Sequence, residues 1–519
     1  MKFKQIMSAM LCLLMIGVLL MGCNNSTQSG TDTTASDTTV SETVTSDADS
    51  TSESESNTET ESESEPAPVI ETEPKSVFVS LCDYNSSATG VSTLRTGIKL
   101  GAAFTVPSGY LTDINILCHN SGSELGGIKF SLYAWDTDYN TTVGKEPVYE
   151  NIFDKFINGS AIMVNFEEGK VPAGRYVYLL DIPETNTGAN AVGPYSGSGW
   201  STRNLPEEYK QYDIEFLQNG KKTKSSMMAN FSYTCDMPKE EIEPEKVSKD
   251  KDPDGTAKVI LLAGQSNASG VSRSDLLKSN VGEEAYAKYE AGFENVKILY
   301  DCENHGNKSD GFVNVKAGQG CNSLTFGPEL GLAEYLNNTY PDETFYIIKL
   351  GVGGSILDTE WFAAKEEGGT EGKYLTAFKS KINEGLEILK GEGLNPKIVS
   401  FMWMQGESDA IFVSTAYRFY DNQLALVNEI RKTFKDEASV RGISFIDAGI
   451  SNAPYWTAYK KINNEKYRMS LLSDANYYID TIANNIITLN ENNDMAHYDS
   501  TCMIKLGQLY GQTLSLAID

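Results

Sequence analysis

The chain has 519 residues, a formal net charge of −28 at pH 7 and only three histidines. This length exceeds what one hydrophobic core holds, so two or three domains are expected. The negative charge argues against nucleic acid and anionic lipid surfaces as partners, because both are met by a basic patch. The eight cysteines include no Cys-x-x-Cys pair and there are only three histidines, so a zinc site is not expected. No cofactor is predicted.

Residues 1–22 carry the pattern of an export signal. Lys2 and Lys4 precede an apolar run over 6–20 that is too short to span a bilayer comfortably. The run ends in LMGC, which resembles a bacterial lipobox with Cys23 as the lipidated residue. We therefore predict a lipoprotein signal peptide and an extracytoplasmic protein that is lipid-anchored at the bacterial cell surface. An ordinary signal peptide followed by an incidental cysteine is the alternative.

Residues 23–75 form an acidic tract rich in Ser and Thr. Residues 24–75 contain 13 Asp and Glu residues and one lysine. Such a tract buries too little apolar surface to fold, and its like charges keep the chain extended. We predict a disordered stalk that holds the following domains away from the membrane, so that the lipid anchor is the only membrane contact.

Residues 76–236 contain short runs of β-branched and aromatic residues separated by Gly, Asn and Ser, for example FSLYAWDTDY, AIMVNFEE and RYVYLLDIP. This spacing predicts a β-sandwich domain. Some of its aromatic residues either stack on sugars, which would make the domain carbohydrate-binding, or fill the core: Tyr133, Trp135, Tyr195 and Trp200. The charged, Pro-containing residues 237–256 are predicted to be an interdomain linker.

From residue 257 to residue 519, apolar runs alternate with amphipathic helical patterns. The expected strands are KVILLAG, TFYIIKLG, KIVSFMWMQ and GISFIDAG, and the expected helices cover about 328–338, 374–390, 415–435 and the stretch after 500. This alternation predicts an α/β domain in which helices cover both faces of a parallel sheet, a three-layer α/β/α sandwich. Cys302 and Cys321 bracket one irregular loop and are a candidate disulfide pair.

The first expected strand of this domain ends abruptly in Gly-Gln-Ser-Asn, within VILLAGQSNASG. Open α/β sheets carry their sites at the carboxyl ends of the strands, which makes Ser266 a candidate nucleophile. The alternative is a strand-to-helix turn in which Ser266 only caps the next helix. An α/β-hydrolase elbow is excluded, because the second Gly of Gly-x-Ser-x-Gly is Ala268 here.

A nucleophilic serine needs a base, which is usually histidine, and a group that orients that base. His119 lies in the predicted β-sandwich and His305 in an irregular insertion, whereas His497 lies in NDMAHYDS before the last helix. Asp494 precedes His497 by three residues, so one turn can bring the two side chains together. We predict Ser266, His497 and Asp494 as catalytic residues. Asp-x-x-His is also common in the first turn of a helix.

The oxyanion of an ester reaction needs donors that are in place beforehand. GVGGS follows one expected strand and offers the N–H group of Gly353 or Gly354, and Gln405 follows the next strand. Alternatively, the glycines form only a tight turn and Gln405 satisfies only loop backbone. Glu407 and Asp409 belong to one short loop, which need not separate them as paired catalytic carboxylates require. Structural support is therefore favoured over acid–base work.

The blocks AGQSN, GPELG, GVGGS, WMQGESDA and DMAH, taken together and in this order, resemble the SGNH-type carbohydrate esterases, within them the sialate O-acetylesterase and acetylxylan esterase branch. The resemblance covers about residues 257–519. It implies a flavodoxin-like SGNH hydrolase sheet and metal-free deacetylation of a glycan. It also implies a role for each matching residue: Ser266 nucleophile, His497 base, Asp494 its orienter, and the Ser266 amide, Gly353 or Gly354, and Gln405 as oxyanion donors. Gln265, Asn267 and Glu407 are expected to support these groups.

We therefore predict a carbohydrate O-acetylesterase that acts on an acetylated poly- or oligosaccharide. The sugar stays open between xylan, sialic acid and other acetylated glycans, and so does a longer acyl group. The alternative from another class is a non-catalytic surface lipoprotein that binds glycans, with the β-sandwich as the binding domain.

Overall fold

The computed structural model describes residues 72–519 except for short segments at 84–89, 121–126, 155, 157, 185–191, 199–206, 239–242, 367, 412, 487 and 489–493. The predicted signal peptide, Cys23, residues 24–71 of the stalk and Trp200 lie outside the described residues. The last residues of the predicted stalk are not disordered, because they open strand β1 (Thr72–Ser80), which pairs with β12 (Ala229–Pro238). The predicted linker is shorter at both ends, where β12 and β13 (Thr256–Gly264) extend into it.

The N-terminal strands form one connected antiparallel network with the main path β1-β12-β3-β7-β4-β5. The long strand β3 (Leu100–His119) is its centre and pairs with β6, β7, β8, β9 and β12. The other elements are β2 (Gly90–Val91), β4 (Ile128–Ala134), α2 (Tyr139–Val143), β5 (Tyr149–Phe153), β6 (Ala161–Asn165), β7 (Pro172–Asp181), β8 (Gly193–Ser198), η1 (Glu207–Tyr212), β9 (Glu215–Gln218), β10 (Lys221–Lys222) and β11 (Ser225–Met227). These pairings do not establish two facing sheets, so the β-sandwich stays a prediction.

Two of the candidate sugar-stacking aromatics pack on this network. Tyr133 and Trp135 are partly buried against a small apolar cluster that includes Val177 and Leu179. The guanidinium of Arg175 lies 4.9 Å from the centre of the Trp135 ring, so this ring already has a cation on one side. These contacts favour a packing role for Tyr133 and Trp135.

The second sheet has a parallel core, as the alternating pattern predicts. Its strands are β13, β15 (Phe293–Cys302), β19 (Phe345–Gly351), β20 (Asn395–Met404), β21 (Ser444–Ala448) and β22 (Asn476–Ile479), in the order β15-β19-β13-β20-β21-β22. The short strands β16 (Asn307–Lys308) and β17 (Val313–Val315) pair with β15 in antiparallel fashion, and β14 (Ser272–Arg273) pairs with β18 (Thr325–Phe326). The residues from Val259 to Gly264 are all buried, as a central strand requires.

The order of the parallel strands corrects the flavodoxin-like prediction. Counted along the chain from β13, the order is 2-3-1-4-5-6, whereas flavodoxin has 2-1-3-4-5. The difference arises after β13, where α3 (Ser266–Ser269), α4 (Ser274–Val281) and α5 (Glu283–Ala291) come before β15. This long excursion takes the chain past the position beside β13, which β19 then fills.

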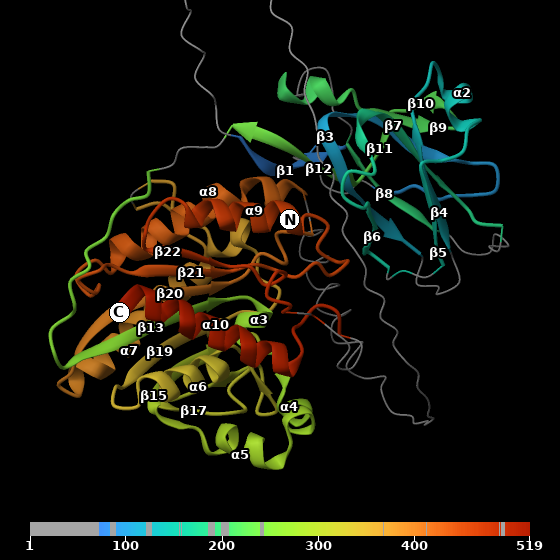
Figure 1. Cartoon of the computed structure of the whole chain (residues 1–519). Helices are drawn as coiled ribbons and strands as arrows, with labels where there is room; N and C mark the ends of the chain where they lie inside the picture. Colours follow the sequence, from blue (N-terminus) through green and yellow to red (C-terminus); the bar gives the residue numbers. More distant parts are fainter. Residues whose placement is uncertain are drawn as a thin grey trace, which may run out of the picture. The chain divides into compact units, whose positions relative to one another are not determined.

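Helices cover both faces of this sheet (Figure 1). Ile348 and Lys349 are consecutive residues of β19, so their side chains point to opposite faces. Ile348 lies against Gly385 of α7 (Lys373–Gly391), whereas Lys349 is ion-paired with Glu329 of α6 (Glu329–Thr339). The other helical elements are η2 (Leu357–Trp361), α8 (Val413–Thr433), α9 (Tyr459–Ser470) and α10 (Ser500–Ile518), and α10 packs along α6.

The carboxyl ends of the three central strands are aligned. Gly264 of β13 is in register with Gly351 of β19 on one side and with Met404 of β20 on the other. The loops that follow these strands therefore begin side by side, and they contain the predicted nucleophile and the predicted oxyanion donors. Among the described residues, no helix has the length and hydropathy needed to cross a membrane.

Candidate active site

Ser266 is presented by a sharp turn at the end of β13. Gly264 has φ = 145°, and a Cβ atom there would lie 1.9 Å from the carbonyl oxygen of Met404 in β20. Only glycine fits this close approach of two backbones. The Gln265 N–H group then donates to the same carbonyl at 2.9 Å, and α3 begins at Ser266. The strand end therefore brings the side chain directly into the loops at this edge of the sheet.

Asp494 and His497 form the predicted pair. The Nδ1 atom of His497 lies 2.6 Å from Oδ2 of Asp494, and the backbone N–H groups of Ala496 and His497 donate to the other carboxylate oxygen. Burial raises the pKa of Asp494, but the hydrogen bonds and the proximity of His497 outweigh it and lower the pKa. The carboxylate therefore stays ionised and can hold a protonated imidazole. The Nε2 atom of His497 is shielded from solvent and has no hydrogen-bond partner in the described structure.

Asn267 connects the serine turn to the histidine loop. Its side chain donates to the carbonyl oxygen of Ala496 at 3.5 Å and accepts from the N–H group of Tyr498 at 3.3 Å, so it bonds both chain neighbours of His497. Because Asn267 directly follows Ser266, the predicted nucleophile and the predicted base are brought to the same place. The described structure contains no direct hydrogen bond from Ser266 Oγ to His497 Nε2, a contact that often forms only with substrate bound.

The backbone around Ser266 offers free donors. The N–H groups of Ser266, Gly353 and Gly354 donate to no acceptor in the part of the chain that the structure describes. A Cβ atom at Gly353 would lie 3.9 Å from the Cβ atom of Ser266, so the glycine loop borders the predicted nucleophile. The loop is held there because the Val352 N–H group donates to Gly264 O at 3.0 Å. Two backbone donors beside a serine are what an oxyanion hole requires.

Gln405 follows the end of β20, but the contacts of its amide differ from the predicted role. Its side chain is fully buried, and Nε2 donates to Ser355 O and to Asp409 Oδ2. Both N–H bonds of the amide are therefore used within the protein, and this geometry does not favour Gln405 as an oxyanion donor. Asp409 also accepts from the N–H groups of Leu357 and Asp358, and burial raises its pKa to about 6. Gln405 and Asp409 thus brace the start of η2.

Gln265 and Glu407 form hydrogen bonds around the serine turn. The side-chain oxygen of Gln265 accepts from the N–H groups of Gly406 and Ser408 at 3.4 and 3.2 Å. The carboxylate of Glu407 is buried and accepts from Asn267 Nδ2 at 2.7 Å, and burial raises its pKa. With both Glu407 and Asp409 bound to neighbouring groups, paired acid–base work by them is not favoured.

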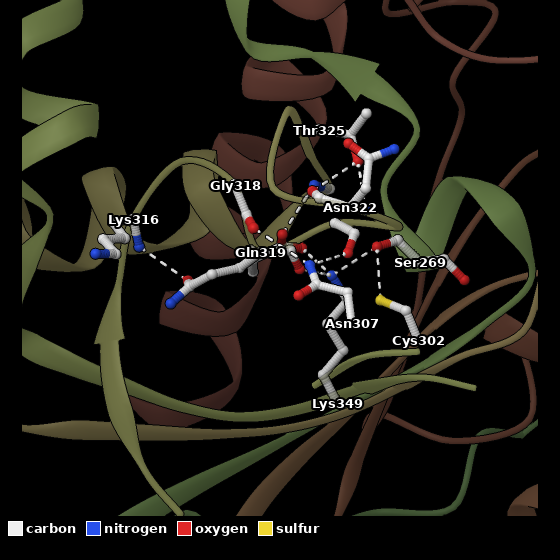
Figure 2. A network of polar contacts seen from close by, with 12 residues as sticks. Ser269, Cys302, Asn307, Lys316, Gly318, Gln319, Asn322, Thr325 and Lys349 are labelled. Carbon is white, nitrogen blue, oxygen red and sulfur yellow. Dashed lines mark hydrogen bonds and ion pairs between the residues drawn. The ribbon is translucent and has the colours of Figure 1, made fainter. Parts of the chain in front are cut away.

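A buried ion pair behind α3 was not assigned from the sequence. Lys349 Nζ donates to Ser269 O at 2.9 Å, to Gln319 O at 3.3 Å and to Glu329 Oε2 at 2.8 Å, so all three of its protons are used (Figure 2). Both side chains of the pair are fully buried. Burial lowers the pKa of Lys349, but Glu329 outweighs this effect and raises it. A lysine inside the apolar strand FYIIKLG was the available sequence signal.

The loop after β15 also lies at the site, which was not predicted. His305 and Asn304 lie against Gly353, and Asn304 Nδ2 donates to its carbonyl oxygen at 2.9 Å. Cys302 and Cys321, the candidate disulfide pair, are both free and buried.

The sequence model of one protein family, carbohydrate esterase, sialic acid-specific acetylesterase, matches residues 256–515, about half of the chain. No curated protein matches the sequence significantly. A solved structure from Arabidopsis thaliana has 16% identity and a TM-score of 0.36, and it covers 51% of this chain and 100% of that chain. NanS has 15% identity and a TM-score of 0.36, covering 51% and 98%. Est2A, an acetyl xylan esterase from Butyrivibrio proteoclasticus, has 8% identity and a TM-score of 0.23, covering 84% and 98%. These TM-scores are too low to establish a shared fold.

Proposed function

The chain belongs to the sialic acid-specific acetylesterase family of carbohydrate esterases, and we propose that it releases acetate from acetylated poly- or oligosaccharides by a Ser-His-Asp mechanism. One observation carries this proposal. Asn267 bonds both neighbours of His497, and it therefore holds the His497–Asp494 pair beside Ser266. The arrangement contains a nucleophile, a base with a free Nε2 atom and an ionised group that orients the base.

In the proposed reaction, Ser266 Oγ attacks the acetyl carbonyl carbon while His497 Nε2 takes the hydroxyl proton. Asp494 stabilises the imidazolium that forms, and the N–H groups of Ser266 and of Gly353 or Gly354 bind the oxyanion. The bond between the carbonyl carbon and the sugar oxygen then breaks, and the sugar oxygen receives the proton from His497. Water attacks the acetyl-serine with His497 as the base, so that acetate leaves and the Ser266 hydroxyl is restored.

The substrate is tested by acetate release from a panel that includes acetylated xylan and O-acetylated sialic acid. We expect the full chain without its signal peptide to release acetate from at least one of them without added metal or cofactor. Release from one glycan and not the others would identify the substrate class. Binding of a glycan without release of acetate from any of them would contradict the proposal and support the alternative, a non-catalytic glycan-binding lipoprotein.

We also propose that the chain is exported and tethered to the bacterial cell surface through a lipid on Cys23. The support is the sequence alone, namely the LMGC tetrapeptide after a short apolar run. An acetylated glycan outside the cell would then be within reach of the enzyme.

A further inference from the structure

His305 occupies the rim of the candidate active site. Its Nε2 atom lies 3.4 Å from the position that a Cβ atom on Gly353 would take, and the Cβ atom of Ser266 lies 3.9 Å from the same position. The imidazole and the nucleophile therefore border the same small space above the glycine. Partial burial lowers the pKa of His305, and interaction with His497 lowers it further.

The loop that carries His305 is anchored at both ends. At one end, Cys302 Sγ donates to Ser269 O at the end of α3, and Cys302 O accepts from the His305 N–H group at 2.8 Å. At the other end, Asn307 Nδ2 donates to Gly318 O at 3.3 Å and Gly320 O at 2.7 Å (Figure 2). Asn304 fastens the middle of the loop to Gly353 O. The network around Lys349 thus holds this loop in place beside the nucleophile.

The His305 side chain has no hydrogen-bond partner among the described residues. Neither ring nitrogen of His305 forms a hydrogen bond with a described residue, and the residue as a whole is open to solvent although its neighbours partly desolvate the ring. A neutral imidazole offers one donor and one acceptor, and the lowered pKa keeps this ring neutral near pH 7. An unused donor and acceptor at the rim of a catalytic site are suited to a hydroxylated ligand.

The chemistry of the proposed reaction leaves only one part of the substrate for this histidine. The carbonyl oxygen is bound by the backbone donors, the oxygen that joins acetyl to sugar is protonated by His497, and the acetyl methyl group is apolar. The sugar hydroxyl groups and ring oxygen are the polar atoms that remain. We propose that His305 is a substrate-binding residue that forms a hydrogen bond with the sugar that carries the acetyl group. This inference rests on the proposed function.

The test compares two substrates for each variant: the glycan ester that the wild type cleaves fastest, and 4-nitrophenyl acetate, which has no sugar. In the His305→Phe variant, we expect the ratio of the two kcat/KM values, glycan over small ester, to fall about tenfold, mainly through KM for the glycan. His305→Gln keeps a donor and an acceptor and should recover part of the ratio. Glu303→Gln, at an exposed position of the same loop, is the matched control and should leave the ratio unchanged.

An unchanged ratio in His305→Phe, or an equal loss on both substrates, would overturn the inference while the proposed function stands. If the wild type cleaves no sugar ester, the proposed function fails and the inference fails with it. Circular dichroism of each variant checks that the fold is retained, and recovery in His305→Gln separates hydrogen bonding from loss of structure.

Discussion

At the scale of single residues, the contacts of Asp494 determine its pKa. Burial alone would raise its pKa, yet the hydrogen bond from His497 and two backbone N–H groups bring it below the ordinary value. The same contacts hold His497 so that Nδ1 faces the carboxylate and Nε2 stays free. In the proposed mechanism, the aspartate both selects the tautomer of the base and stabilises its charged form.

Replacing Asp494 with Asn should therefore leave the loop nearly unchanged but impair the base. We expect kcat to fall by about 10³- to 10⁴-fold, because an amide does not stabilise the imidazolium and can select the wrong tautomer. Steady-state kinetics on the cleaved ester measure this loss. A fall of less than about tenfold would show that Asp494 does not orient the base.

The lowered pKa of Asp494 also predicts that the free energy of unfolding depends on pH. Since the folded-state pKa of Asp494 is lowered, its stabilising contribution is complete above the unfolded-state value, about 3.9, and is lost as the pH falls through the lower folded-state value. The difference in Tm between the wild type and Asp494→Asn should thus be larger at pH 7 than at pH 3. A difference that stays constant between these pH values would contradict the lowered pKa.

For two residues, the side-chain contacts could not be predicted from the sequence. Gln405 lies at a strand end as predicted, but its amide donates to Ser355 O and Asp409, and these contacts depend on tertiary packing. The sequence places His305 in an irregular insertion and gives no sign that it approaches the site. Only the folded loop brings it against Gly353.

Among the elements, β19 is joined by Lys349 both to α6, through the ion pair with Glu329, and to the serine turn, through Ser269 O. The Lys349 ammonium donates to Glu329 of α6 and to the carbonyl oxygen of Ser269, the last residue of α3 (Figure 2). A buried charge that loses its partner is strongly destabilising, whereas replacing both charges costs less. The pair is therefore a sensitive probe of how the serine turn is supported.

We expect Lys349→Met to lower the free energy of unfolding by about 3–5 kcal/mol, because it leaves Glu329 buried without a partner. The double variant Lys349→Met with Glu329→Gln should be less destabilised than the single one. Lys373→Met is the matched control, since Lys373 pairs with Glu360 at the surface and should cost less than about 1 kcal/mol. Urea unfolding measures all three. Equal losses of unfolding free energy in Lys349→Met and Lys373→Met would argue against a structural role of the Lys349–Glu329 pair.

The strands and their parallel direction were predictable, because apolar runs such as VILLAG must be buried on both faces. The order of the strands was not. It depends on where the excursion from α3 to α5 leads the chain, and local sequence does not encode that path. Within the predicted triad, the Asp494–His497 contact follows from the spacing of the two residues, whereas the link to Ser266 through Asn267 requires the fold.

At the scale of the whole molecule, a family domain over residues 256–515 follows an antiparallel β region and an acidic N-terminal tract. The segment order agrees with an enzyme presented outside the cell on a charged stalk, which is a proposal from the sequence. Residues 1–71, which carry the export and anchoring pattern, lie outside the described residues.

The anchor is tested by Cys23→Ser in cells that express the full chain. The wild type should be found in the membrane fraction and should take up a labelled fatty acid, whereas Cys23→Ser should take up no label, because the thiol that would receive the lipid is missing. Immunoblotting for the protein in the membrane and soluble fractions shows where each form is found. Equal labelling of both proteins would contradict lipidation at Cys23.

The central claim is that Ser266 carries the acetyl group during turnover. The most direct measurement is mass spectrometry of peptides from a reaction quenched with acid during hydrolysis of an acetyl ester, with Ser266→Ala as the matched variant. We predict one added acetyl group on the peptide that contains Ser266, no such adduct in the variant, and a fall in its kcat of at least about 10⁴-fold. An acetyl adduct at another residue, or wild-type turnover by Ser266→Ala, would contradict the claim.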